Sequence, residues 1–134
     1  MTELTVNDLW GVWSLRTWRR HDVDGSVSTP LGERGGGRLI YESSGKMAAL
    51  LMPGGWPTST EPPGVAFTAY SGGFYLKDGS VHHVVDLATL RTMVGATLPR
   101  KASITADGAL VLEAAPTSAD PKALRHVLEW IREA

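Results

Sequence analysis

Short runs in which apolar and polar residues alternate recur along the chain, and small turn residues separate them in pairs. In the clearest pair, Ala66 to Leu87, two stretches rich in Val, Phe, Tyr and Thr flank Asp78-Gly79. An Asp-Gly step supplies the positive φ angles of a tight turn, so this segment predicts a β-hairpin. The same signal recurs between apolar runs at Asp24-Gly25, Ser44-Gly45 and Asp107-Gly108. Four hairpins in sequence order predict eight antiparallel strands.

A meander of eight strands is expected to close into a barrel, because closure removes the unpaired backbone groups of the edge strands. A barrel of this size has room for one small ligand. The predicted fold class is therefore all-β, an eight-stranded antiparallel up-and-down β-barrel, with residues 1–134 as a single domain. A short helical turn is expected ahead of the first strand, where Asn7 or Asp8 is the candidate N-cap.

The alternation also predicts individual strands and their faces. Strands are expected at Gly11 to Arg20, Arg38 to Glu42, Lys46 to Met52, Lys101 to Thr105 and Ala109 to Ala115. Strict alternation places Trp13 and Trp18 on opposite faces of the first strand. The run MAALLM is apolar on both faces, which predicts a pocket inside and a partner subunit or packed loop outside. The segment from Leu90 to Arg100 is expected to be irregular, because it contains Gly95 and Pro99.

The C-terminal segment carries two conflicting signals. Asp120 is a candidate helix N-cap, Pro121 fits the first helical position, and apolar residues follow at helical spacing up to Ile131. A closed meander instead needs its last strand here, because the first strand would otherwise be left at an edge. The local pattern favours a helix, whereas the global fold favours a strand.

The segment from Pro53 to Gly64 contains four of the eight prolines of the chain and is expected to form a surface loop. Its one large apolar residue, Trp56, has two interpretations. It is either a lid residue over the mouth of the barrel or an anchor that pins the loop to the rim. Both roles produce the same sequence signal.

Composition narrows the function classes. With a net charge of −1, the chain has no basic excess to meet phosphates, which argues against nucleic acid as a partner. No run approaches membrane-spanning length, and the N-terminal residues match neither a signal peptide nor a transit peptide. The lack of cysteine excludes disulfides and thiolate sites and fits a reducing compartment. We therefore expect a cytoplasmic protein with neither a membrane nor a nucleic-acid partner.

No complete catalytic motif such as G-x-S-x-G or H-E-x-x-H is present, so the candidate chemistry rests on single polar residues. Alternation points His83 into the barrel and His82 outward, so the two cannot share a metal ion, and no metal site is expected. His83 is either a general acid or base, or a core histidine satisfied by one hydrogen bond. Tyr41 and Tyr70 are candidate catalytic donors to a carbonyl or enolate oxygen, or else cross-strand packing residues.

A further set of residues is expected to bind a substrate where its members face inward. Inward arginines would hold a carboxylate or enolate, whereas outward arginines would only aid solubility. Tryptophans would supply apolar and cation-binding walls, or plain core. The predicted substrate-binding residues are Arg16, Trp18, Arg38, Met52, Trp56 and Tyr75.

Four stretches carry a family likeness, namely GVWSLRTW, RLIYESSGKMAALLM, AYSGGFYLKDGSVHHVV and LEWIRE. Together with Gly95 and Arg100, they resemble the bacterial lipocalin-like domains of about this size. The resemblance implies an antiparallel β-barrel with a central cavity, and its last strand matches LRHVLEWIR, so we expect a strand from Leu124 to Arg132. It also implies a structural pairing of Arg132 with Gly11-Val12-Trp13 at the closed end. The proline-rich segment and Thr117 to Lys122 are not family hallmarks, which leaves the loop contacts at the mouth open.

Two function classes fit these residues. The first is a cofactor-free biosynthetic enzyme that binds an apolar, polyketide-like substrate in the barrel and assists cyclisation, isomerisation or dehydration. The resemblance permits this class, since barrels of similar build serve as cyclases in bacterial natural-product pathways. The second is a non-catalytic carrier or sensor of a small hydrophobic ligand. A polar pair inside the cavity favours the enzyme, and a uniformly apolar cavity favours the carrier. The MAALLM strand and the first-strand tryptophans also predict a homodimer.

Overall fold

The computed structural model describes residues 3–32, 34–62, 67–115 and 120–133. Ala66, Gly64 and Thr117, which end or begin three of the segments discussed above, lie outside these ranges. A helical turn α1 (Val6–Leu9) and two 3₁₀ turns, η1 (Trp56–Thr58) and η2 (Arg91–Met93), accompany the strands. The strands are β1 (Gly11–Asp22), β2 (Val27–Ser28), β3 (Gly36–Tyr41), β4 (Lys46–Met52), β5 (Thr68–Lys77), β6 (Ser80–Ala88), β7 (Thr97–Ile104), β8 (Leu110–Ala114) and β9 (Ala123–Arg132).

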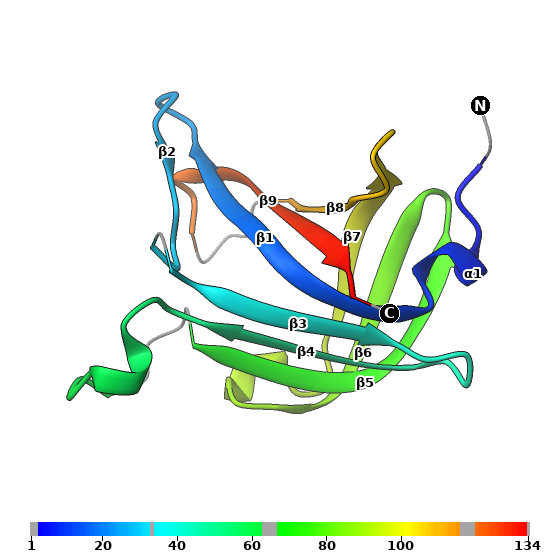
Figure 1. The fold of residues 1–134 in the computed structure, drawn as a ribbon, viewed down its shortest axis with the longest axis horizontal. Helices are drawn as coiled ribbons and strands as arrows, with labels where there is room; N and C mark the ends of the chain where they lie inside the picture. The colour runs from blue at the N-terminus through cyan, green and yellow to red at the C-terminus, as the bar shows by residue number, and fades with distance from the viewer. Residues whose placement is uncertain (1–2, 33, 63–66, 116–119, 134) are drawn as a thin grey trace.

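The strands form one antiparallel sheet that closes into a barrel (Figure 1). Neighbours follow the order β2-β1-β3-β4-β5-β6-β7-β8-β9, and β1 pairs in addition with β9. Eight long strands make the barrel wall, which confirms the predicted fold class. The short β2 only extends the hairpin at Asp24-Gly25, so β9 supplies the eighth strand of the wall.

The C-terminal segment is a strand, as the barrel topology predicts. β9 pairs with β1 from Trp13 opposite Arg132 to Asp22 opposite Ala123, and with β8 on its other side. Backbone hydrogen bonds on both edges outweigh the local helical spacing of the apolar residues, because helix propensity is a weak preference that tertiary pairing overrides. The helix signal at Asp120 is therefore misleading.

The predicted hairpin turns are present, but the segment expected to be irregular needs correction. Asp78-Gly79 joins β5 to β6, and both residues have positive φ. β7 begins at Thr97, within the segment predicted to be irregular. Pro99 fits there because β8 pairs only from Lys101 onward, so β7 has a single partner strand at the proline.

The first helical turn also differs in detail from the prediction. Its N-cap is Thr5 rather than Asn7 or Asp8. The Asp8 carboxylate accepts hydrogen bonds from the backbone N–H and the hydroxyl of Thr5. The carboxylate at the third helical position thereby satisfies the backbone N–H of the N-cap residue, as in a capping box.

A β-bulge in β1 changes which residues face the interior. Leu15 pairs with Trp130, and Thr17, not Arg16, pairs with the next residue, Glu129. The extra residue reverses the alternation, so Trp18 follows Trp13 onto the inner face. The prediction that the two tryptophans lie on opposite faces is therefore wrong.

A second bulge lies between β5 and β6, next to Gly72. Ser71 pairs with Leu87 whereas Gly72 pairs with Val85, so the alternation of β6 is broken. Strict alternation from His83 predicts Leu87 on the inner face, but Leu87 is exposed on the outer surface. A Cβ atom on Gly72 would lie 1.9 Å from the carbonyl oxygen of Val84, so only glycine fits at this close approach of the two strands.

The apolar core fills the end of the barrel beside α1, which we call the closed end (Figure 1). Trp13 is completely buried there and donates its indole N–H to the carbonyl of Leu9 at 2.9 Å. The Arg132 guanidinium lies 4.1 Å from the Trp13 ring centre and donates to the carbonyls of Asp8 and Trp10. Gly11, the first residue of β1, has a φ of 133°. The contact implied by the family resemblance is therefore present.

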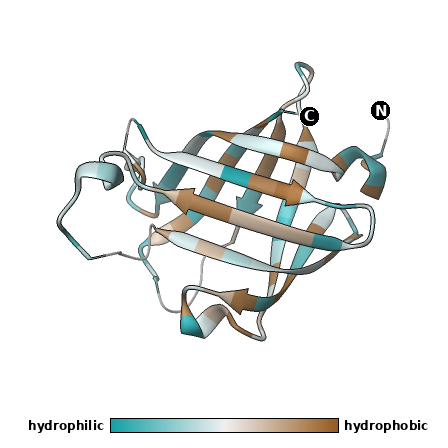
Figure 2. Ribbon diagram, turned by 60° about the horizontal axis from the view of Figure 1, so that its bottom comes forward, coloured by the Kyte–Doolittle hydropathy of each residue, from teal (hydrophilic) through white to brown (hydrophobic). Residues whose placement is uncertain are grey.

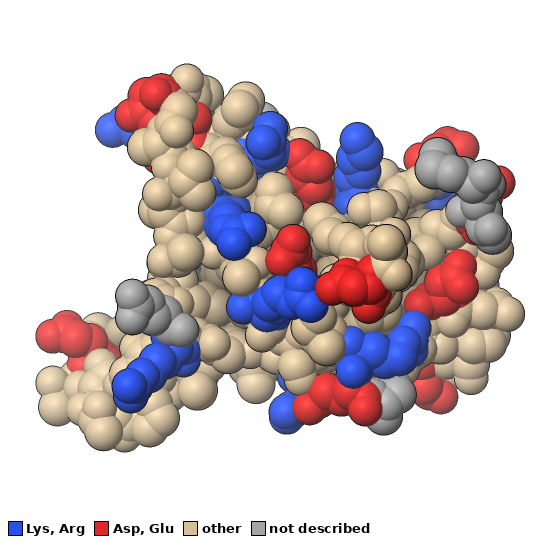
Figure 3. All heavy atoms as spheres, turned by 45° about the horizontal axis from the view of Figure 1, so that its top comes forward, with Lys and Arg blue, Asp and Glu red and all other residues tan. Residues whose placement is uncertain are grey.

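The outer surface is mixed in character. On the face drawn in Figure 3, basic and acidic side chains are interspersed. Apolar positions continue along β4, as the hydropathy colouring in Figure 2 shows. No helix in the described part of the chain is long and apolar enough to cross a membrane.

Candidate functional site

The interior is packed at the closed end and accessible at the opposite end, which we call the mouth. Inward residues near α1, such as Trp13 and Leu39, have no exposed surface. At the mouth, the side chains of Arg20 and Asp22 keep about a quarter of their surface exposed, 26% and 24%. Polar side chains inside the barrel are thus reachable from this end.

Three of the predicted catalytic residues meet inside the barrel. His83 on β6 lies between two tyrosines, with its Nε2 2.5 Å from the Tyr41 hydroxyl and its Nδ1 2.7 Å from the Tyr70 hydroxyl. Tyr41 ends β3 and Tyr70 lies near the start of β5, so three strands contribute one residue each. We call this group the tyrosine–histidine chain. Its neighbour His82 points outward and stacks on Tyr75, as the alternation predicts.

Burial determines how protons are shared along this chain. Tyr41 is 1% exposed, and His83 Nε2 is the one hydrogen-bond partner of its hydroxyl among the described residues. A buried hydroxyl that merely accepted would leave its own proton unpaired, at a cost of about 1–3 kcal/mol. Tyr41 therefore donates to Nε2, the ring proton of His83 sits on Nδ1, and Nδ1–H donates to the Tyr70 oxygen. The Tyr70 proton is then left free for a ligand.

The ionisation states agree with this assignment. Burial, followed by the charges of Arg100 and His82, lowers the pKa of His83 to about 3, so its ring is neutral at pH 7. Burial raises the pKa of Tyr70 and raises that of Tyr41 well above 10. Both hydroxyls consequently keep their protons. The chain is a line of neutral hydrogen bonds, in which each bond polarises the next.

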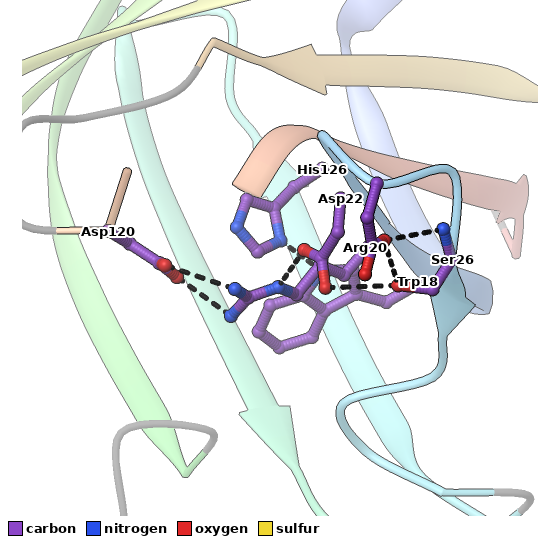
Figure 4. Close-up of polar contacts among 7 residues, drawn as sticks. Trp18, Arg20, Asp22, Ser26, Asp120 and His126 are labelled. Carbon is purple, nitrogen blue, oxygen red and sulfur yellow. Dashed lines mark hydrogen bonds and ion pairs between the residues drawn. The ribbon is translucent and has the colours of Figure 1, made fainter. Parts of the chain in front are cut away.

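A second polar group, the mouth cluster, comprises Trp18, Arg20, Asp22, Asp120 and His126 (Figure 4). The Trp18 indole N–H donates to Nδ1 of His126 at 3.0 Å. Because indole nitrogen only donates, the proton of a neutral His126 ring must sit on Nε2. Burial, then the charge of Arg20, lowers the pKa of His126, although Asp120 opposes this. His126 thus presents an Nε2–H with no acceptor among the described residues.

Arg20 forms ion pairs with two carboxylates of the mouth cluster. Its Nε lies 2.7 Å from Asp22, and its two terminal nitrogens lie 2.7 and 3.0 Å from the two oxygens of Asp120 (Figure 4). This forked contact uses the planar geometry of the guanidinium. Arg20 therefore joins β1 to the segment before β9, and its charge is met by two carboxylates.

Arg100 is the inward cation of the barrel that has no carboxylate partner in the described part of the chain. It pairs with the buried Val81 of β6, so both point inward. Its one hydrogen bond joins its Nη1 to the adjacent carbonyl of Pro99. The charge of Arg100 contributes to lowering the pKa of both His83 and His126, so it acts on the tyrosine–histidine chain and on the mouth cluster.

The predicted substrate-binding residues are divided between the two faces. Trp18 faces the interior, whereas Arg16 and Arg38 lie outside and pair with Asp107 and Glu133. The predicted role of these two arginines depended on an inward position, which neither has. Arg16 faces outward because the bulge of β1 begins there. Tyr75 also faces outward.

The two remaining members lie near the mouth. Met52 ends β4. It lies two residues after the outward Leu50, so alternation places it on the outer face as well. Trp56 packs on Phe67 with ring centres 4.5 Å apart, so it contacts its own loop. Whether this loop moves as a lid stays a prediction.

Three interior residues were absent from the predicted set. Arg20 was missed because the bulge reverses the alternation of β1 beyond Arg16. Arg100 lies in the segment expected to be irregular, and His126 in the segment with conflicting helix and strand signals. Once β7 and β9 are known, simple alternation places both side chains inside.

A shallow outer groove of about 600 Å³ lies on the opposite side of the sheet. Ile40, Ala48, Leu50 and Leu87 are among its lining residues, and all four point away from the interior. Its lining is mostly apolar and includes Arg38. The outer groove is therefore an alternative binding site to the interior for an apolar molecule.

Comparisons with known proteins agree with the architecture. No curated protein matches the chain. A protein-family model described as a lipocalin-like domain matches residues 10–133, a range that contains all nine strands and every interior residue described above. The lipocalin-like barrel suggests binding of a small ligand. The chain belongs to the lipocalin-like domain family.

Proposed function

We propose that the protein is a cofactor-free enzyme that binds a small, largely apolar molecule inside the barrel and assists its cyclisation, isomerisation or dehydration. The observation that supports this proposal is the free Tyr70 proton at the end of the tyrosine–histidine chain. A tyrosine hydroxyl held in this way donates to a carbonyl oxygen and stabilises the negative charge that develops there when the neighbouring carbon loses a proton to solvent water. Such stabilisation needs no cofactor. The cysteine-free composition supports a reducing cytoplasm as the proposed location.

Of the three residues in the tyrosine–histidine chain, only Tyr70 contacts the substrate. Both ring nitrogens of His83 are engaged, and its pKa of about 3 makes it a weak base, so it acts as a positioning residue for Tyr70. Tyr41 fixes the ring proton on the nitrogen that faces Tyr70. Trp18 supplies an apolar wall nearer the mouth.

The alternative function is that of a carrier or sensor of the same molecule. One observation favours the carrier: both ring nitrogens of His83 already have hydrogen-bond partners. A barrel in which this histidine is not free to act as a base is well suited to hold a ligand unchanged. The two functions share one binding site and differ in the consequence of losing the Tyr70 hydroxyl.

The binding site is tested by native mass spectrometry of the protein purified from its producing cells, together with two matched tryptophan variants. Ala114 pairs with His126 and points into the barrel, whereas Ala48 lines the outer groove. We expect the wild-type protein and Ala48→Trp to carry a bound apolar metabolite, and Ala114→Trp to lose it, because the indole fills the interior. Loss of the metabolite from Ala48→Trp alone would place the site in the outer groove and contradict the proposal.

We further propose that two copies associate through the outer groove. Leu50 and Leu87 are 43% and 68% exposed there, more than an unpartnered surface usually shows for neighbouring leucines. We expect sedimentation analysis to show a dimer that Leu50→Asp converts to a monomer, because the carboxylate would be buried unpaired. A wild-type protein that stays monomeric at high concentration would refute this association.

A further inference from the structure

The interior offers several hydrogen-bond donors without acceptors in the part of the chain that the structure describes. They are the Tyr70 hydroxyl, the His126 Nε2–H, the remaining N–H groups of Arg100 and the buried indole N–H of Trp130. The carboxylates of Asp22 and Asp120 do not accept from these donors, because both are paired with Arg20. A ligand that complements this surface must therefore contribute acceptor oxygens.

The strand register brings two of these donors to one level of the barrel. Lys101 pairs with Glu113, and Ala114 pairs with His126, so Arg100 and His126 lie in line across β7, β8 and β9. Only the small side chain of Ala114 stands between them on the inner face. Arg20 pairs with His126 on the other side and continues the same level into β1.

The charges at this level sum to zero, but they are unevenly paired, because both carboxylates contact Arg20 and neither contacts Arg100. Asp22 and Asp120 together supply two negative charges, and Arg20 meets both of them. Arg100 adds a cation in a half-buried setting, where an unpaired charge is costly. One singly charged anion would complement it, and the planar guanidinium fits the two oxygens of a carboxylate.

We infer that the ligand of the barrel carries a carboxylate group, and that Arg100 binds this group together with the Nε2–H of His126. The inference rests on the proposed ligand site inside the barrel and adds the chemical class of its occupant. The apolar part of the molecule then extends along Trp18 toward Tyr70, whose hydroxyl reaches a second oxygen of the ligand. An apolar carboxylic acid with a further carbonyl group satisfies the donors of Arg100, His126 and Tyr70.

Calorimetric titration with 2-naphthoate and 4-phenylbutyrate, each compared with its neutral primary amide, tests this inference. We expect each carboxylate to bind about tenfold or more tightly than its amide, because charge-assisted hydrogen bonds contribute that much to affinity. Arg100→Gln should abolish the preference and leave amide binding unchanged. The outward Arg16→Gln is the matched control and should retain the full preference.

The outcomes separate this inference from the proposed function. Acids and amides that bind wild type equally well, and are both lost in Ala114→Trp, would overturn the carboxylate assignment while the interior site stands. A preference that survives in Arg100→Gln would overturn it as well. No binding of any probe to the wild-type protein would overturn both proposals. Thermal unfolding checks that Arg100→Gln folds, which we expect because no carboxylate of the described residues loses a partner.

Discussion

Tyr70→Phe is expected to lower the turnover of the barrel's substrate by about 10²–10³-fold, the usual effect of removing one donor to a developing oxyanion. The phenyl ring of the variant keeps the shape of the tyrosine ring. The lost hydroxyl is the one group of the tyrosine–histidine chain that has a proton free for the ligand. Binding should weaken far less, by about fivefold, because a single hydrogen bond contributes about 1 kcal/mol to affinity.

This difference between turnover and affinity distinguishes the enzyme from the carrier. Tyr75→Phe is the matched control, since it removes the same atom from a tyrosine on the outer face. Turnover of the metabolite identified by mass spectrometry and its dissociation constant are measured for both variants. A Tyr70→Phe protein with full turnover would exclude the proposed catalytic role, and an effect on binding alone would favour the carrier.

Trp13→Ala is expected to cost about 3–5 kcal/mol of unfolding free energy, the usual range for a buried tryptophan. The ring is completely buried, donates to Leu9 and carries the Arg132 guanidinium on its face, so the variant loses contacts at the closed end and leaves a cavity. For a chain of this length, that loss lowers the melting temperature by roughly 10–20 °C.

Trp18→Ala provides the comparison within the same strand. Trp18 is only partly buried and stands at the mouth, so its removal leaves little enclosed volume. We expect a cost of about 1–2 kcal/mol, mainly from packing and the lost hydrogen bond to His126. Chemical denaturation measures both variants. Equal losses for the two tryptophans would show that the closed end is not the main core.

Much of the barrel follows from turn residues and alternation. The Asp-Gly and Ser-Gly steps locate the hairpins, and β4 is predicted with its observed bounds, Lys46 to Met52. The last strand could not be derived locally, because its apolar residues suit a helix equally well. Only the requirement that β1 have a partner, together with the family resemblance, favours a strand.

The candidate site was predictable where strand alternation is regular. Tyr41, Tyr70 and His83 were identified as candidates, and the structure places them in contact. Their distances and proton positions depend on barrel closure, which no local pattern contains. At Arg16, one extra residue reverses the facing of everything after it, so the inward Arg20 and Trp18 could not be told from their outward neighbours.

The histidines provide the most direct test of the central claim that the ligand lies inside the barrel. Two of the four are interior, His83 and His126, whereas His21 and His82 face outward. NMR of their ring nitrogens reports both the position of each proton and the approach of a ligand. The probe is 2-naphthoate or its amide, whichever binds more tightly.

In the free protein at pH 7, we predict neutral rings with the proton on Nδ1 of His83 and on Nε2 of His126. Addition of the probe should shift the signals of these two rings and leave those of His21 and His82 in place. A probe that binds without moving either interior histidine would place the site outside the barrel and contradict the account.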